Sequence, residues 1–421
     1  MIFDRAYRQR LETDLARWEA DGVVAPAAVA AIRAALPPVS PGVNIAVVVA
    51  IVGGLLIASA FLAFIAAHWT EIARLSRLAI LFAGIVVTHG IGAWFARTER
   101  PMLADLCASV GAIIFGAGIA LVGQMYHLGS DFAGGLLLWA VGALVAAALT
   151  GSRGALAVAL VAASIWSSMR VVEAQDAPHL PFLIIWFVAA GLALAWNSRV
   201  AAHLVALAVL PWWIAAAAMH TDHDAIFILG GGAALLFGGG LALTITPWQR
   251  LASAGTVLSV YGAFSLATVA VGGVATVNDS FFGSAPAAGP PLWAIGCSVA
   301  GALVAFAAGT AARRAGILAA GIGIALALVA TGAWKQAPTG EPWLLYAAFL
   351  CAMVCIVVSG ILDSSRPRIV AGWLGIAGVI GAITWAVKGS LLGRSVFLAV
   401  AGAIAVALAL MLNRLLPRTQ P

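Results

Sequence analysis

The sequence predicts an all-α fold, a polytopic transmembrane helical bundle with about 14 transmembrane helices. Hydrophobic residues make up 63% of the 421 residues and charged residues only 9%, whereas about a quarter of an ordinary soluble domain is charged. Apolar stretches of roughly 18 residues, the length that crosses a bilayer, recur from residue 43 to residue 412. Arginine recurs in every second connection between them, as expected of cytoplasmic loops.

The chain divides into a cytoplasmic amphipathic helical segment (1–42), a transmembrane helical domain (43–412) and a cytoplasmic tail (413–421). In the first segment, large apolar residues recur at spacings of three and four, which places them on one side of a helix. These residues are Phe3, Tyr7, Leu11, Leu15 and Trp18. Because residues 1–36 are charged where a signal peptide would be apolar, we expect an uncleaved anchor rather than a signal peptide.

Charges, prolines and Asn/Gly clusters interrupt the apolar pattern and separate the predicted helices. Two of these, 134–150 and 181–197, are short for a hydrocarbon core of about 30 Å, and we consider them candidates for hairpins that do not fully cross. The predicted helices are 43–67, 78–96, 103–123, 134–150, 154–172, 181–197, 200–219, 225–245, 251–273, 291–311, 315–334, 342–362, 369–387 and 394–412.

The distribution of cationic residues predicts the orientation. With both termini in the cytoplasm, sixteen of the 22 Lys and Arg residues fall on the cytoplasmic side, in agreement with the positive-inside rule. We therefore expect a multi-pass protein of the bacterial inner membrane, with its N and C termini inside. Five of the seven histidines fall on the outer side, which directs the search for a site to that face: His68, His127, His179, His220 and His223.

Polar side chains gather in the first two outer loops. Seven of them form a predicted substrate-binding mouth: His68, Glu71, Arg74, Gln124, Tyr126, His127 and Asp131. Arg74 departs from the positive-inside tendency, which favours an anionic partner for it. The alternative is a hydrated interfacial loop with Tyr126 and Trp69 in the aromatic belt.

The same region carries a resemblance to a known family. The segments GGLLIASAFLAFIAAHWTEIARLSRLAILFAG and GAIIFGAGIALVGQMYHLGSDFAGGLLLWAVGAL resemble the bacterial family called domain of unknown function 2157, a family of predicted membrane proteins. The resemblance covers about residues 5–150, including the amphipathic start. It supports the membrane topology and the choice of Gln124, Tyr126 and His127, and it implies no particular activity.

A second candidate set lies inside the predicted helices. His89 is an ionisable residue near the middle of a span, and such residues are functional candidates; Ser259, Tyr261 and Ser265 make 251–273 the most polar interior helix. These four residues are predicted to line an interior path. The alternatives are a neutral histidine bonded within the protein and hydroxyls that bond across helices. The 46 glycines predict close helix packing, with a glycine-lined path as the alternative.

Two hypotheses of function follow. In the first, the protein is a transporter or channel for a small or lipid-like substrate; in the second, it is a scaffold or sensor that docks a membrane or periplasmic protein through its outer loops or N-terminal helix. We expect no membrane-buried Asp or Glu, which argues against a carboxylate-based ion-coupled pump. No Walker loop, nucleophile elbow or HExxH motif is present, so we predict no catalytic residues, no cofactor, no metal and no nucleic acid partner.

Overall fold

The computed structural model describes residues 2–35, isolated positions between 49 and 63, and residues 73–126, 131–174, 178–220, 222–277, 291–334 and 343–386. Within these residues it contains fourteen helices and no strand, which confirms the all-α prediction. The helices are α1 (Ile2–Ala20), α2 (Pro26–Ala35), α4 (Arg74–Arg97), α5 (Pro101–Tyr126), α6 (Phe132–Thr150), α7 (Arg153–Ala174), α8 (Phe182–Ala195), α9 (Arg199–Ala218), α10 (Asp222–Thr244), α11 (Gln249–Val277), α12 (Leu292–Ala312), α13 (Ala315–Trp334), α14 (Trp343–Leu362) and α15 (Arg366–Ala386).

Twelve of the predicted membrane helices correspond to α4 to α15, with each end within four residues of its prediction. The first and last predicted helices, 43–67 and 394–412, lie outside the described residues apart from isolated positions in the first. Apolar runs separated by charges and turn residues were therefore enough to predict these twelve helices.

Ten described helices are long and apolar enough to cross a membrane. The region predicted as 134–150 is among them, because α6 begins at Phe132 and has 19 residues. In contrast, α8 has only 14 residues, or about 21 Å at 1.5 Å per residue. The expectation of a short helix is thus confirmed for α8 and wrong for α6.

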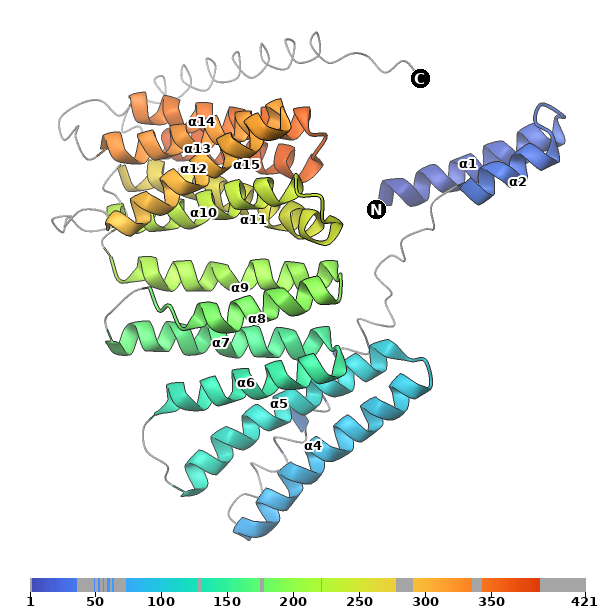
Figure 1. Cartoon of the computed structure of the whole chain (residues 1–421), viewed down its shortest axis with the longest axis vertical. Coiled ribbons are helices and arrows are strands. Elements are labelled where there is room, and N and C mark those ends of the chain that lie inside the picture. Colours follow the sequence, from blue (N-terminus) through green and yellow to red (C-terminus); the bar gives the residue numbers. More distant parts are fainter. Residues whose placement is uncertain are drawn as a thin grey trace.

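The long helices lie side by side in a stack (Figure 1), and their buried side chains form two hydrophobic cores. The first core joins α6, α7, α8 and α9, and its members include Leu156, Phe182 and Trp212. The second core joins α10 to α15 and is built around Phe237, Phe349 and Met353. Helix α9 packs on both α10 and α11, so the two cores meet there.

Arginines gather at one end of the stack. The turns between α4 and α5, α6 and α7, α8 and α9, α10 and α11, α12 and α13, and α14 and α15 are two to four residues long, so consecutive helices run antiparallel and these turns share one end. We call it the arginine-rich end; it lies toward the right in Figure 1. The arginines at these turns are Arg97, Arg100, Arg153, Arg199, Arg250, Arg313, Arg314, Arg366 and Arg368.

The N-terminal segment folds as a helical hairpin of α1 and α2. Leu15 and Val29 are each only 1% exposed, and Arg33 Nε forms an ion pair with Glu12 Oε2 at 3.0 Å. The segment predicted as helical from the sequence thus contains two helices, with α2 beginning at Pro26.

Candidate functional site

The predicted mouth is described only in part. His68, Glu71 and His127 lie outside the described residues, and of Arg74 only the backbone is described, as the first residue of α4. Gln124 and Tyr126 are exposed at the end of α5, and Tyr126 is 46% exposed. The mouth therefore remains a prediction, and Asp131 is its one member with described polar partners.

Asp131 forms a charged cluster with the end of α7. Its side chain caps α6 by accepting a hydrogen bond from the Gly134 amide at 2.8 Å. The Arg170 guanidinium donates to Asp131 at 2.8 Å and to Glu173 at 2.9 Å. One cation thus bridges two carboxylates, which leaves this cluster with an excess negative charge at the end opposite the arginine-rich end.

The predicted interior residues do not share one face. His89 Nδ1 lies 2.9 Å from the Ile85 carbonyl oxygen of its own helix, and its ring occupies the space that a Cβ on Gly111 of α5 would need. Ser259 is fully buried and donates to the Thr256 carbonyl, whereas Tyr261 lies two residues further on, against the ring of His203 with the ring centroids 5.8 Å apart.

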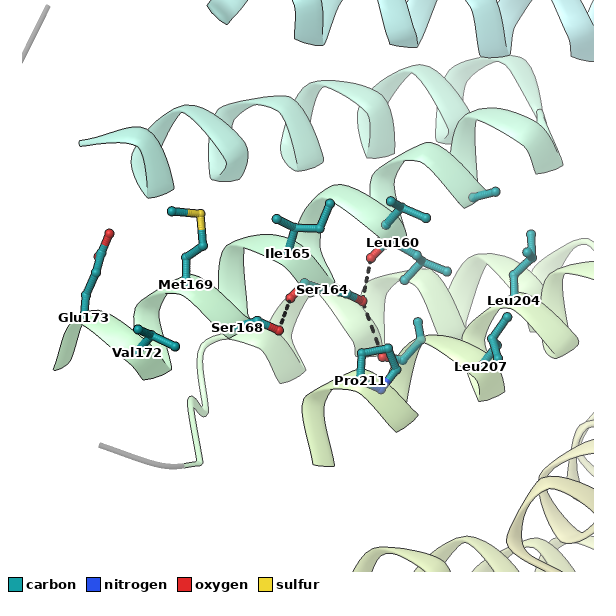
Figure 2. A pocket seen from close by; sticks show the side chains of 13 residues that line it. Leu160, Ser164, Ile165, Ser168, Met169, Val172, Glu173, Leu204, Leu207 and Pro211 are labelled. Carbon is teal, nitrogen blue, oxygen red and sulfur yellow. Dashed lines mark hydrogen bonds between the residues drawn. The ribbon is translucent and has the colours of Figure 1, made fainter. Parts of the chain in front are cut away.

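A groove lies between α7 and α9. Its volume is about 610 Å³, and most of the atoms that line it are apolar. Figure 2 shows the side chains that α7 and α9 contribute to its walls. The α7–α9 groove is lined by Ala157, Leu160, Val161, Ser164, Ile165, Ser168, Met169, Val172, Glu173, Leu204, Leu207, Ala208 and Pro211.

The groove opens on the outer surface of the bundle. Val161 is 57% exposed and Leu207 is 51% exposed, so apolar walls face the surroundings of the helices rather than the core. Both helices that form the groove, α7 and α9, are long and apolar enough to cross a membrane.

A few polar groups interrupt the apolar wall. Ser164 donates to the Leu160 carbonyl at 2.8 Å and lies 3.5 Å from the Ala208 carbonyl of α9. Ser168 donates to the Ser164 carbonyl at 2.9 Å (Figure 2). Glu173 lies at the end of the groove nearest the Asp131 cluster.

Aromatic rings pack beside the groove on the core side of α7. The His179 ring meets Trp166 edge to face, with centroids 4.6 Å apart, and its Nδ1 lies 3.1 Å from Ser167 Oγ. The His179 carbonyl accepts a hydrogen bond from Trp212 Nε1 at 2.8 Å. Burial, and secondarily the positive charge of Arg170, lower the pKa of His179 below its usual value.

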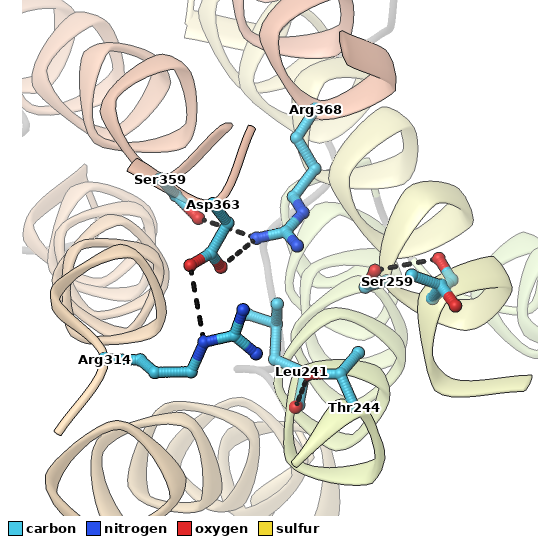
Figure 3. A network of polar contacts seen from close by, with 8 residues as sticks. Leu241, Thr244, Ser259, Arg314, Ser359, Asp363 and Arg368 are labelled. Atoms are coloured by element: carbon cyan, nitrogen blue, oxygen red, sulfur yellow. Dashed lines mark hydrogen bonds and ion pairs between the residues drawn. The ribbon is translucent and has the colours of Figure 1, made fainter. Parts of the chain in front are cut away.

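A second polar cluster lies at the arginine-rich end (Figure 3). The Arg368 guanidinium donates to Asp363 at 2.8 Å and to Ser359 at 3.2 Å, and the side chains of Arg368 and Asp363 are only 5% and 6% exposed. Arg314, in the turn between α12 and α13, approaches the other oxygen of Asp363 at 3.7 Å. This cluster ties the α12–α13 turn to the α14–α15 turn.

A carboxylate also joins two helices in the first half of the bundle. Asp105 of α5 accepts hydrogen bonds from the Ser152 hydroxyl and from the Gly154 amide at the start of α7. Two carboxylates are thus buried at helix ends: the Asp363 side chain is 6% exposed, and Asp224, in the first turn of α10, is 3% exposed. They escaped prediction because turns between helices look solvent-exposed in sequence.

The groove between α7 and α9 was not predicted from the sequence. Two features of the sequence could have indicated it. Pro211 interrupts an apolar run, and Ser164 and Ser168, four residues apart, lie on one side of a helix. Within the described residues, no group of three or more His, Cys, Asp or Glu side chains could hold a metal ion.

Comparison with known proteins supports the membrane assignment. Residues 16–156 match the family model described as "Predicted membrane protein (DUF2157)", which confirms the resemblance seen in the sequence. No curated protein and no solved structure matches the chain. The chain is thus a membrane protein with many apolar helices. The residues that line the groove begin at Ala157, one residue beyond the matched segment.

Proposed function

We propose that this chain is a multi-pass protein of the bacterial inner membrane that transports a lipid-like substrate, which it receives from the bilayer in the α7–α9 groove. The observation that carries the proposal is the groove itself, with a volume of about 610 Å³ and apolar side chains along its walls (Figure 2), of which Val161 and Leu207 are more than half exposed. Its size falls within the range of ligand pockets, about 300 to 1,000 Å³.

The distribution of arginines supports an orientation with the N and C termini in the cytoplasm. Nine arginines lie at the arginine-rich end, whereas Arg77 and Arg170 lie toward the opposite end. Cytoplasmic loops carry such an excess of Lys and Arg. In this orientation Glu173 marks the periplasmic end of the groove.

The proposal can be tested by filling the groove with a larger side chain. Val161→Trp places an indole in it, and Val145→Trp places the same group on α6, where Val145 is 52% exposed compared with 57% for Val161. A phospholipid with a diazirine on one acyl chain should label the groove in the parent protein. In the Val161→Trp variant, this labelling should fall by about tenfold, the ratio given by 1.4 kcal/mol.

The matched Val145→Trp variant should label as the parent does. Equal labelling of the groove in both variants, or no labelling in the parent, would contradict the proposal. Proteoliposomes that contain the two variants should show the same contrast in the rate at which a fluorescent lipid changes leaflet.

The alternative function, a scaffold that docks a partner protein, draws on one observation. The α1–α2 hairpin buries Leu15 and Val29 and has its own ion pair, so it forms a small folded unit that a partner could recognise. Deletion of residues 2–35 separates the two functions. A transporter keeps its lipid labelling after the deletion, whereas a scaffold loses a co-purifying partner and shows no groove labelling at any stage.

A further inference from the structure

The polar atoms of the α7–α9 groove are hydrogen-bond acceptors. A serine hydroxyl has one proton, and Ser164 and Ser168 direct theirs to carbonyls of α7 or α9. Their oxygens retain lone pairs for another donor. The remaining side chains of the wall, apart from Glu173, are apolar or proline.

Pro211 adds an acceptor from the backbone. Proline has no amide hydrogen, so it cannot donate to the carbonyl four residues earlier in the helix. In α9 that carbonyl belongs to Leu207. Leu207 and Pro211 both line the groove, so the carbonyl between them lies on the groove side of α9. A carbonyl exposed to hydrocarbon without a donor is costly, which favours an occupant that supplies one.

Glu173 gives the groove a charge at its periplasmic end. Among the described residues, the carboxylates of Glu173 and Asp131 share one guanidinium, that of Arg170, so these three side chains carry one negative charge in excess. An anionic head group at this position would be repelled by that excess. A cationic head group would be attracted, and an ammonium group would also donate hydrogen bonds to Glu173.

The positions of these acceptors along α7 define the depth of a polar zone. Glu173 lies nine residues beyond Ser164, which corresponds to about 14 Å of helix. On the other side of Ser164 the groove continues past Leu160, Ala157 and Leu204, which are apolar. The groove is therefore apolar along most of its length and carries its one charged side chain, Glu173, at the end opposite the arginine-rich end, as an amphiphile would require.

We infer that the α7–α9 groove selects an amphiphile with a protonated amine as its head group and an alkyl chain that extends past Leu160 and Leu204. The inference rests on the proposed function, because it takes the groove to be the place where the lipid-like substrate enters. It goes further by naming the class of substrate: lipid amines are accepted, whereas fatty acids and other anionic amphiphiles are excluded.

The test compares three single-chain probes of equal length, each with a diazirine at the chain end: an alkylamine, an alkyl alcohol and an alkyl carboxylate. The full chain is reconstituted in nanodiscs, at a pH where the amine is protonated and the acid is ionised. Mass spectrometry then measures labelling of α7 and α9 relative to labelling of the lipid-exposed residues of α6, which corrects for partitioning of each probe into the bilayer. The amine should exceed the carboxylate by about tenfold, as expected of a charge-assisted hydrogen bond.

Two variants identify the source of this preference. Glu173→Gln should lower labelling by the amine to the level of the alcohol, whereas Glu99→Gln, an equally conservative change at an exposed carboxylate of the arginine-rich end, should leave it unchanged. Pro211→Ala restores the amide donor to the Leu207 carbonyl and should lower labelling by the amine and the alcohol alike. Neither Glu173→Gln nor Pro211→Ala removes a fully buried apolar side chain, so both variants should fold.

The outcomes separate the inference from the proposed function. If the carboxylate labels the groove as strongly as the amine, or if Glu173→Gln leaves the preference intact, the inference is wrong, while the groove remains an entry site. If none of the three probes labels α7 and α9 above α6, both the inference and the proposed function are wrong.

Discussion

The two halves of the bundle use glycine differently. In α10 to α15, glycines let one backbone touch another: a Cβ on Gly238 would collide with the Gly301 carbonyl of α12, and one on Gly262 would collide with the Phe237 backbone of α10. In α4 to α6, glycines receive side chains instead, as Gly111 receives His89 and Gly116 receives the Trp139 ring. Backbone contact at glycines thus occurs in the second half, where other glycines such as Gly273 receive a side chain, whereas Gly111 and Gly116 of the first half make room for large rings.

The groove lies where no glycine faces the neighbouring helix. Helix α9 contains no glycine, and the one glycine of α7, Gly154, faces Ser109 of α5. The glycine-mediated backbone contact between α10 and α12 therefore has no counterpart between α7 and α9. The short α8 packs on both helices without covering the groove. A groove remains between α7 and α9 because their backbones are not in glycine contact and no bulky side chain fills the space between them.

Replacement of Gly238 should have the largest effect. In Gly238→Val the new side chain meets the backbone of Gly301, which cannot move as a flexible side chain could. We expect a loss of more than about 4 kcal/mol in the free energy of unfolding, measured by denaturation in detergent micelles. Gly239→Val is the matched control, because nothing lies within 4 Å of a Cβ at Gly239. Similar stability of the two variants would show that close approach does not hold the second half together.

The buried ion pair of the second half gives the next largest effect. Arg368→Met leaves Asp363 buried and reduces its partners to Arg314 at 3.7 Å. The expected cost is about 3 kcal/mol, the lower end for breaking a buried pair. The exposed pair of Arg33 and Glu12, with side chains 46% and 41% exposed, should cost less than about 1 kcal/mol when broken.

The double variant Asp363→Leu, Arg368→Met sharpens this result. It removes both charges from the buried site, so it should recover most of the stability lost in Arg368→Met. If the double variant is less stable than Arg368→Met alone, the carboxylate stabilises the fold through Arg314 rather than through Arg368. Thermal unfolding of the three proteins in the same detergent distinguishes these results.

The helices could be predicted from the sequence because each depends on a local run of apolar residues. The role of His89 could not be chosen from the sequence, since a histidine in mid-span fits either an interior path or an internal hydrogen bond. The structure shows the bond to Ile85 and the contact with Gly111. The mouth that Tyr126 and Asp131 would form with His68 and His127 stays a prediction, since the two histidines lie outside the described residues.

The groove and the Asp363 cluster escaped prediction for a common reason. Both depend on the distance between helices that are far apart in sequence. Asp363 is buried only because the α12–α13 turn meets the α14–α15 turn, and Ser164 faces a groove only because α9 lies beside α7. The periodicity of apolar residues along one helix does not indicate how far that helix lies from another. Pro211 was the local sign, because a proline inside an apolar helix leaves a carbonyl for which some partner must be found.

The smallest predicted effect concerns His179 in the first half. Burial lowers its pKa in the folded state, so the folded protein binds the proton less readily than the unfolded chain does, whose histidine has a pKa of about 6.5. The contribution of His179 to stability is therefore complete above that pH and decreases as the pH falls below it. The melting temperature should decrease between pH 7.5 and pH 5.5, and less so in His179→Gln, which cannot take up a proton. An equal decrease in both proteins would show that protonation of His179 beside Trp166 and Arg170 does not weaken the first half.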